Sequence, residues 1–217
     1  MLKSIKFRNS TVLLTGIVII SAGISIGLYD YFIERKNKAF SEMNIMLYES
    51  EQPENIIQNE NDITYEEPNY KEEEQNDSQN IDSQVYNFLG ILEIPKINLK
   101  NGFYNIDSIY NNVDSSITII NGSTFPGDEN NNLILAAHSG DCSYCYFDKL
   151  YKLELGDKAY LQYENSKYAY EIVNIYEVEK DGTVPIYRDY DKNCLTLITC
   201  TRNSNTKQTV YILEQIN

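Results

Sequence analysis

Seven short apolar segments lie in the last part of the chain, and their spacing is the strongest constraint on its fold. Each is rich in β-branched or aromatic residues and is shorter than a typical helix. Turn signals such as Asn121-Gly122, Gly156-Asp157 and Asp181-Gly182 separate them. The pattern predicts an all-β domain, a sandwich or a barrel, with strands within 88–94, 117–120, 133–137, 159–163, 168–178, 195–200 and 209–213.

Two details refine this expectation. The long segment at 168–178 loses its alternation near Ile172-Val173, which predicts a bulge or corner in one long strand. Helix is scarce, with one short candidate over 143–152 and a turn at 106–111. The folded part, residues 86–217, is about 130 residues long, close to the commonest size of a single domain.

An apolar run near the N-terminus indicates where in the cell the protein lies. Residues 11–28 carry no charge, and aromatic residues extend the run to about residue 33, long enough to cross a ~30 Å hydrocarbon core as a helix. Basic residues within 1–10 favour a cytoplasmic N-terminus, although those at 35, 36 and 38 weaken the charge asymmetry. A cleaved signal peptide is the alternative, but no small-x-small cleavage site follows the run. We predict a single transmembrane helix over 11–33 in the cell membrane, with the remainder extracellular.

The segment at 34–85 differs in composition from both its neighbours. From about Ser41 it is rich in Glu, Asp, Asn, Gln and Ser and is interrupted by Pro53 and Pro68. Such a stretch cannot bury enough apolar surface to offset the entropy of ordering it, so we expect a disordered, acidic, flexible linker. Its carboxylates contribute much of the net charge of −14, which argues against nucleic acid as a partner.

One thiol and the only histidine of the chain each end an apolar run. Cys200 closes the run that begins at Leu195, and His138 closes the run that begins at Asn131. A thiol acts as a nucleophile as its thiolate, which a nearby imidazole favours near neutral pH. Taken singly, Cys200 could be a small buried apolar residue, as most free cysteines are. His138 alone could be a hydrogen-bonded histidine at the edge of a loop. Together they indicate thiol chemistry at a surface cleft.

The sequence motifs around these two residues resemble those of the sortases, the cysteine transpeptidases of Gram-positive cell surfaces. The phrases are Thr196-Leu-Ile-Thr-Cys200 and Ala136-Ala-His138, and those at 90–98, 146–150 and 155–157 follow the family's order. The resemblance covers 86–217 and implies a closed eight-stranded sortase-type β-barrel with one or two short helices, of a class A-like or D-like kind. It implies no cofactor and no metal.

The resemblance also implies a reaction. A membrane-anchored sortase cleaves a C-terminal sorting motif of the Leu-Pro-x-Thr-Gly kind in a secreted surface protein. Cys200 would form an acyl-thioester, and His138 would protonate the leaving amine and later deprotonate an incoming amine of a peptidoglycan precursor or a pilin. Thr199 would position the peptide, and the loop at 178–193 would carry specificity. The phrases of other peptidoglycan cysteine transpeptidases, His-Gly and Ser-x-Gly-Cys, are missing.

The chain departs from the family pattern at the third catalytic residue. Sortases carry an arginine on the strand after the cysteine, and its commoner spacing falls here on Gln208. A glutamine donates hydrogen bonds but supplies no positive charge. Gln208 could replace the arginine, or Arg202 or Arg188 could reach in from a loop, whereas alternation places Lys207 on the opposite face. We assign the charge to Arg202 and the strand position to Gln208, as a substrate-binding residue. The missing arginine also makes a catalytically silent peptide-binding module conceivable.

The remaining cysteines support a competing interpretation. Cys142 and Cys145, with His138 and Cys200, offer four ligands for a zinc or redox site, but a second paired Cys/His knuckle is missing. A disulfide between Cys142 and Cys145, or two loop thiols, is equally compatible with an exported protein. We place Cys194 before the strand proper and assign it no role.

Overall fold

The computed structural model describes residues 3–51, 88–142 and 144–216 and divides the chain into two compact units, 1–43 and 44–217. The first unit is most of helix α1 (Lys3–Glu51). The helix contains a stretch that is long and apolar enough to cross a membrane, by length and composition, and none of that stretch is buried. Large apolar side chains such as Val12, Ile19 and Phe32 are exposed.

Helix α1 is longer than the composition suggested, since it continues through Glu51. No glycine or proline occurs between Leu28 and Glu51. Pro53 comes two residues after Glu51 and disfavours helical backbone at the residue before it. The flexible segment expected over 34–85 is thus helical as far as residue 51, and the rest of that expectation lies outside the described residues. Within the second unit, Ile45 and Tyr48 are buried with Phe88, Ile91 and Tyr104.

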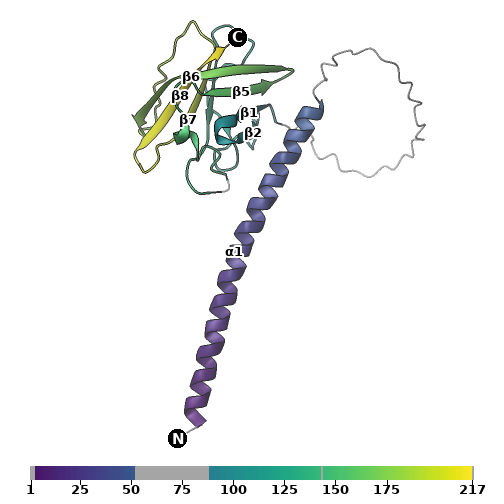
Figure 1. Ribbon diagram of the computed structural model, residues 1–217, viewed down its shortest axis with the longest axis vertical. Coiled ribbons are helices and arrows are strands. Elements are labelled where there is room, and N and C mark those ends of the chain that lie inside the picture. The colour runs from purple at the N-terminus through teal and green to yellow at the C-terminus, as the bar shows by residue number, and fades with distance from the viewer. Residues whose placement is uncertain (1–2, 52–87, 143, 217) are drawn as a thin grey trace, which may run out of the picture. The chain divides into compact units, whose positions relative to one another are not determined.

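The second unit is built on one eight-stranded sheet that curls into a nearly closed barrel (Figure 1). Its strands follow the order β2-β1-β5-β6-β8-β7-β4-β3, and the ends β2 and β3 are joined by the bridge between Phe103 and Ile117. This confirms the predicted all-β, eight-stranded barrel. The strands are β1 (Gly90–Ile94), β2 (Leu99–Phe103), β3 (Thr118–Ile119), β4 (Asn132–Ala136), β5 (Lys158–Tyr163), β6 (Ser166–Glu179), β7 (Cys194–Cys200) and β8 (Lys207–Ile216).

Each of the seven predicted segments contains a strand, and β2 is the one that the pattern missed. Its sequence, Leu-Lys-Asn-Gly-Phe, lacks alternation and contains a glycine. Pairing with β1 defines it, from Gly90 opposite Phe103 to Ile94 opposite Leu99. Gly102 is required there, because a Cβ at this position would come within 2.1 Å of the Phe88 ring.

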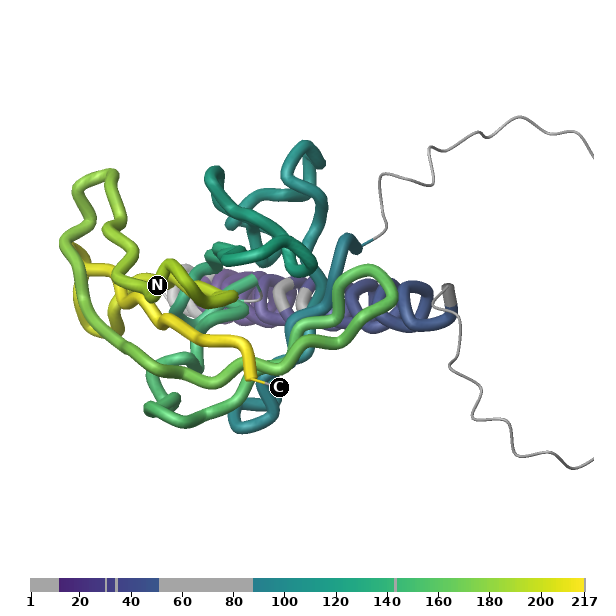
Figure 2. Tube along the Cα trace, turned by 90° about the horizontal axis from the view of Figure 1, so that it is seen from above, coloured from purple at the N-terminus to yellow at the C-terminus, as the bar shows by residue number. Residues whose placement is uncertain are grey.

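The long strand β6 contains the predicted irregularity. Its pairing with β8 shifts register between Ile172 and Asn174, which confirms the bulge expected near Ile172-Val173. Figure 2 shows β8, in yellow, running beside the green β6 along this curved pair. The described residues also contain two single-turn 3-10 helices, η2 (Pro95–Ile97) and η3 (Leu150–Lys152). Of the helix expected over 143–152, the structure shows only the last turn. Before it, the N–H groups of Cys145, Asp148 and Leu150 bond to carbonyls three residues earlier, as in isolated turns.

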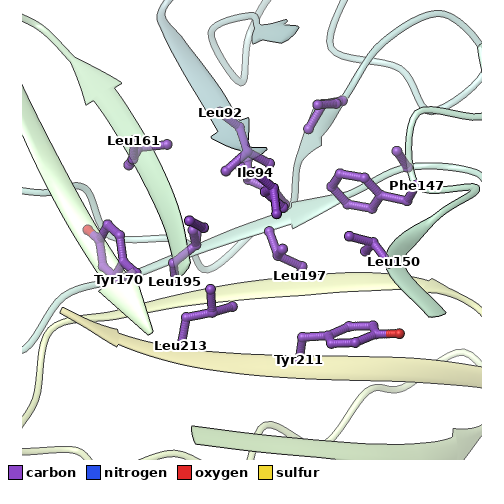
Figure 3. Close-up of a cluster of buried hydrophobic side chains, with 14 of the residues drawn as sticks. Leu92, Ile94, Phe147, Leu150, Leu161, Tyr170, Leu195, Leu197, Tyr211 and Leu213 are labelled. Carbon is purple, nitrogen blue, oxygen red and sulfur yellow. The ribbon is translucent and has the colours of Figure 1, made fainter. Parts of the chain in front are cut away.

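The barrel is filled by apolar side chains from every side. Leu195 and Leu197 of β7, fully buried, pack against Tyr211 and Leu213 of β8 and against Leu92 and Leu161 from the opposite strands (Figure 3). Alternation along β7 therefore sends residues 195 and 197 inward and leaves 196, 198 and 200 on the outer face. A second cluster covers that outer face, formed by Ile134, Ile198, Val210 and Ile212 with Val184 and Ile186 of the β6–β7 connection.

Candidate active site

Strand pairing brings the ends of the two predicted runs together. β4 and β7 are parallel neighbours, with Ala136 opposite Ile198, and the ladder continues through the bond from the Ala137 N–H to the Ile198 carbonyl. His138 and Cys200 each lie two residues beyond that last pair. Because neighbouring strands lie about 4.8 Å apart, the two residues stand side by side at the same end of the sheet.

Both side chains also belong to the same face. Ile134 and Ala136 of β4 and Ile198 of β7 contribute to the outer cluster, so the period of two carries His138 and Cys200 outward as well. Across the next pair Cys200 faces Gln208, and Gln208 faces Val178 of β6. His138, Cys200 and Gln208 thus form one row across three neighbouring strands.

Backbone contacts fix this row from beneath. The Thr199 hydroxyl donates to the Ala137 carbonyl at 2.9 Å, and the Ser139 hydroxyl donates to the Cys200 carbonyl at 2.8 Å. Thr199 is buried, with its oxygen engaged by the neighbouring strand. These two bonds tie the chain around His138 to the chain around Cys200 and so hold the register at the strand ends.

His138 has a carboxylate partner that the sequence did not reveal. Its Nε2 lies 2.9 Å from Asp114 Oδ1, and the side chains are 36% and 74% exposed. An ion pair this exposed contributes little to stability, so its main effect is on the orientation of the ring. Asp114 is 24 residues away in the chain, within a polar loop that carries no periodic signal.

The cations considered for the arginine position have different partners. The Arg202 guanidinium lies 4.0 Å from the centroid of the Tyr151 ring. Arg188 donates to three backbone carbonyls, those of Asp189 and Lys192 in its own loop and that of Asn130 before β4. Lys207 pairs with Glu177 at 3.1 Å, and the hydrogen bond that its ammonium donates to that carboxylate raises the pKa of Lys207.

A different cation lies beside the thiol. Lys180, just beyond β6, donates from Nζ to Cys200 Sγ at 3.7 Å. Its backbone N–H bonds to the Thr206 carbonyl at 2.7 Å, so the pairing of β6 with the β7–β8 connection sets its position. The register could have revealed it, since Lys180 lies two residues past Val178 on the face that carries Gln208 and Cys200.

A cavity of about 670 Å³ opens beside this row. Cys200, Thr199, Lys180 and Arg202 contribute to its walls, whereas His138 and Gln208 flank Cys200 without lining it. Tyr211 forms part of the inner wall, and burial raises the pKa of its hydroxyl to about 12, so it stays neutral near neutral pH. The volume is in the range of ordinary ligand pockets.

The other three cysteines do not complete a metal site. Cys142 and Cys145 form a disulfide with an S–S distance of 2.00 Å, so the four-ligand set with His138 and Cys200 is not present. Of the alternatives left open by the sequence, the structure shows the disulfide. Its loop is also held by the bond from the Phe147 N–H to the His138 carbonyl.

The placement of Cys194 before the strand is wrong. β7 begins at Cys194, and its pairing with β8 runs without a bulge from Cys194 opposite Glu214 to Cys200 opposite Gln208. An even separation then puts both thiols on one face. Cys194 is fully buried, and burial raises the pKa of its thiol, whereas Cys200 is half-buried.

Comparison with known proteins identifies the family of the chain. The Sortase domain family matches residues 92–214, more than half of the chain. The chain therefore belongs to the sortase family.

Individual relatives match more narrowly. Sortase D of Bacillus subtilis (strain 168) is 32% identical over 111 residues, which cover 51% of this chain and 53% of that protein. The chain thus spans about half the length of this curated relative.

Solved sortases share the fold. Sortase C1 from Streptococcus agalactiae is 30% identical with a TM-score of 0.53, over 60% of this chain and 68% of that one. Sortase C from Clostridium perfringens SM101 is 28% identical with a TM-score of 0.51, over 60% and 71%. The lid mutant of sortase A from Corynebacterium diphtheriae, 23% identical with a TM-score of 0.54 over 60% and 70%, shows likeness of fold alone.

Proposed function

We propose that this chain is a membrane-anchored cysteine transpeptidase. It cleaves a sorting motif of the Leu-Pro-x-Thr-Gly kind near the C-terminus of a secreted protein and transfers the new acyl end to an amine. The observation that carries the proposal is the pairing of His138 and Cys200 on one face of adjacent strand ends, with Cys200 opening into a cavity of about 670 Å³. Membership of the sortase family supports it.

The first half-reaction forms a thioester. The Cys200 thiolate attacks the Thr–Gly carbonyl carbon, the C–S bond forms, and the carbonyl electron pair moves to oxygen. When this intermediate collapses, the C–N bond breaks and His138 gives its proton to the leaving amine. Thr199 would keep the strand end in register beneath the peptide, while Gln208 and Arg202 would donate hydrogen bonds to it.

The second half-reaction reverses the roles. An amine of a peptidoglycan precursor or a pilin attacks the thioester, the C–N bond forms and the C–S bond breaks. His138 takes the proton that the amine loses, which restores the starting enzyme. The Asp114 carboxylate at 2.9 Å would hold the ring in one orientation through both steps.

Helix α1 supports the proposed location in the cell membrane. Its apolar stretch would span the membrane once, with the basic residues before it on the cytoplasmic side and the barrel outside the cell. In this orientation the thiol would lie where secreted substrates and cell-wall amines meet. The Cys142–Cys145 disulfide accords with an extracellular setting.

A thioester is the direct test. The full chain in detergent, incubated with a panel of sorting-motif peptides, is expected to gain the mass of the cleaved acyl fragment on Cys200, located by peptide mapping. Cys200→Ala should gain nothing, and the buried Cys194 serves as an internal control because its thiol stays unmodified.

A second candidate function is a silent peptide-binding module, which the neutral Gln208 at the arginine position favours. Saturable binding of a motif peptide with no thioester, across the whole panel, would establish that alternative and end the transpeptidase proposal.

A further inference from the structure

We propose that Lys180 is a catalytic residue of this site and supplies the positive charge that the missing arginine would give. The inference rests on the proposed function. In it, the Lys180 ammonium neutralises first the Cys200 thiolate and then the oxyanion on the attacked peptide carbonyl.

Contact with the reacting atom is the first argument. Lys180 Nζ lies 3.7 Å from Cys200 Sγ, within hydrogen-bonding distance of a sulfur acceptor. In the tetrahedral intermediate the oxyanion is bonded to the carbon that the sulfur has just joined. A cation already beside the sulfur therefore reaches the new charge with little movement, which is the condition for preorganised stabilisation.

The free charge of Lys180 is the second argument. In the part of the chain that the structure describes, no carboxylate forms an ion pair with the Lys180 ammonium. The adjacent Asp181 carboxylate is turned away, because its Oδ1 accepts from the Thr183 N–H and hydroxyl at 3.0 Å each. These hydrogen bonds, the backbone one first, lower the pKa of Asp181. The ammonium thus points its charge at the thiol and not at a neighbouring acid.

The other cations considered for the arginine position are engaged elsewhere. Arg202 stacks on Tyr151, Arg188 is bound to backbone carbonyls, and Lys207 is paired with Glu177. The sequence alone favoured Arg202 as the source of the positive charge, but in the structure Lys180 lies beside the thiol. Arg202 lines the cavity and remains a candidate for contact with the peptide.

Lys180 and Gln208 divide what one arginine does in the family. A guanidinium combines a permanent charge with a planar set of donors, whereas an ammonium is a compact point charge. Gln208 stands opposite Cys200 on β8 and brings an uncharged amide, and Lys180 brings the charge from β6. Neither residue gains or loses a proton in the steps written above, so the proton balance stays with His138.

The test compares Lys180→Ala and Lys180→Arg in the full chain, with the single-turnover rate of thioester formation as readout. Alanine is expected to lower this rate about 10²–10³-fold, as loss of an oxyanion partner does, with little change in KM. Arginine should restore most of it. Lys158→Ala, at an exposed lysine at the start of β5, is the matched control and should be silent.

A second readout needs no peptide. The rate at which iodoacetamide alkylates Cys200 at neutral pH reports its thiolate content, and Lys180→Ala is expected to lower it while Lys180→Arg does not. If wild type forms the thioester and Lys180→Ala forms it within about threefold of the same rate, Lys180 is not the charge donor and the transpeptidase stands. If wild type forms no thioester with any peptide, the transpeptidase proposal fails. Alkylation then still decides whether Lys180 acts on the thiol, and equal rates would overturn the inference.

Discussion

Alanine in place of His138 is expected to slow thioester formation about 10²–10⁴-fold, the usual contribution of a positioned general acid or base. The reason is that the leaving amine must gain a proton as the C–N bond breaks, and the row on β4, β7 and β8 holds a single imidazole beside the thiol. Stopped reactions analysed by mass spectrometry would give the rate. The barrel should stay folded, because His138 is part-exposed and its ion pair with Asp114 lies at the surface.

Asp114→Asn is the matched variant for this experiment. It keeps a side chain of similar size that can hydrogen-bond to His138, so a much smaller loss than for His138→Ala is expected, within about tenfold of wild type. A His138→Ala enzyme with wild-type thioester kinetics would remove His138 from the mechanism. Restoration of the slow variant by added imidazole would support a role in proton transfer.

Leu197→Ala should have the largest effect on stability, lowering the free energy of unfolding by about 2–5 kcal/mol. Leu197 is fully buried and stands between Leu135 of β4 and Tyr211 of β8 in the middle of the sheet. Truncation leaves a cavity where the surrounding strands are held by their ladders and cannot collapse inward. Since small domains are stable by only about 5–15 kcal/mol, this is a large share of the total.

Urea unfolding followed by the near-UV circular dichroism of the tyrosines measures this loss, since the chain has no tryptophan. Val173→Ala is the control. Val173 lies at the bulge of β6 and is 42% exposed, so its truncation should change stability by no more than about 0.5 kcal/mol. Equal losses for the two variants would show that the inner face of β7 is not the centre of the core.

The alternation of apolar and polar residues predicted those parts of the fold in which one face of a strand is buried. Alternation revealed the strands and the bulge at Ile172, because burial on one face leaves a period of two in the sequence. Strand β2 was not predicted from the sequence, because its pairing with β1 and the small size of Gly102 define it. The C-terminal part of helix α1, residues 34–51, was not predicted either, because its polar composition is compatible with both helix and disorder.

The candidate site divides in the same way. His138 and Cys200 could be predicted, because each ends an apolar run that predicts a buried strand. Asp114 lies in a loop 24 residues before His138, and Lys180 lies just beyond β6, 20 residues before Cys200. Strand pairing and loop geometry bring them to the site, so the local sequence pattern does not reveal them. Cys194 was misplaced because the start of β7 depends on its partners: Asn132 of β4 and Glu214 of β8 pair with it on either side.

The parallel contact between β4 and β7 also determines when the site can form. Thr199 and Ala137, bonded side chain to backbone, are 62 residues apart, and η3, β5 and β6 lie between them in the chain. Contacts of such long range form late and slowly, because the entropy of closing the loop opposes them until other strands are in place. We therefore expect the His138 imidazole and the Cys200 thiol to come together only after most of the barrel has formed, so that thiol reactivity appears late in folding.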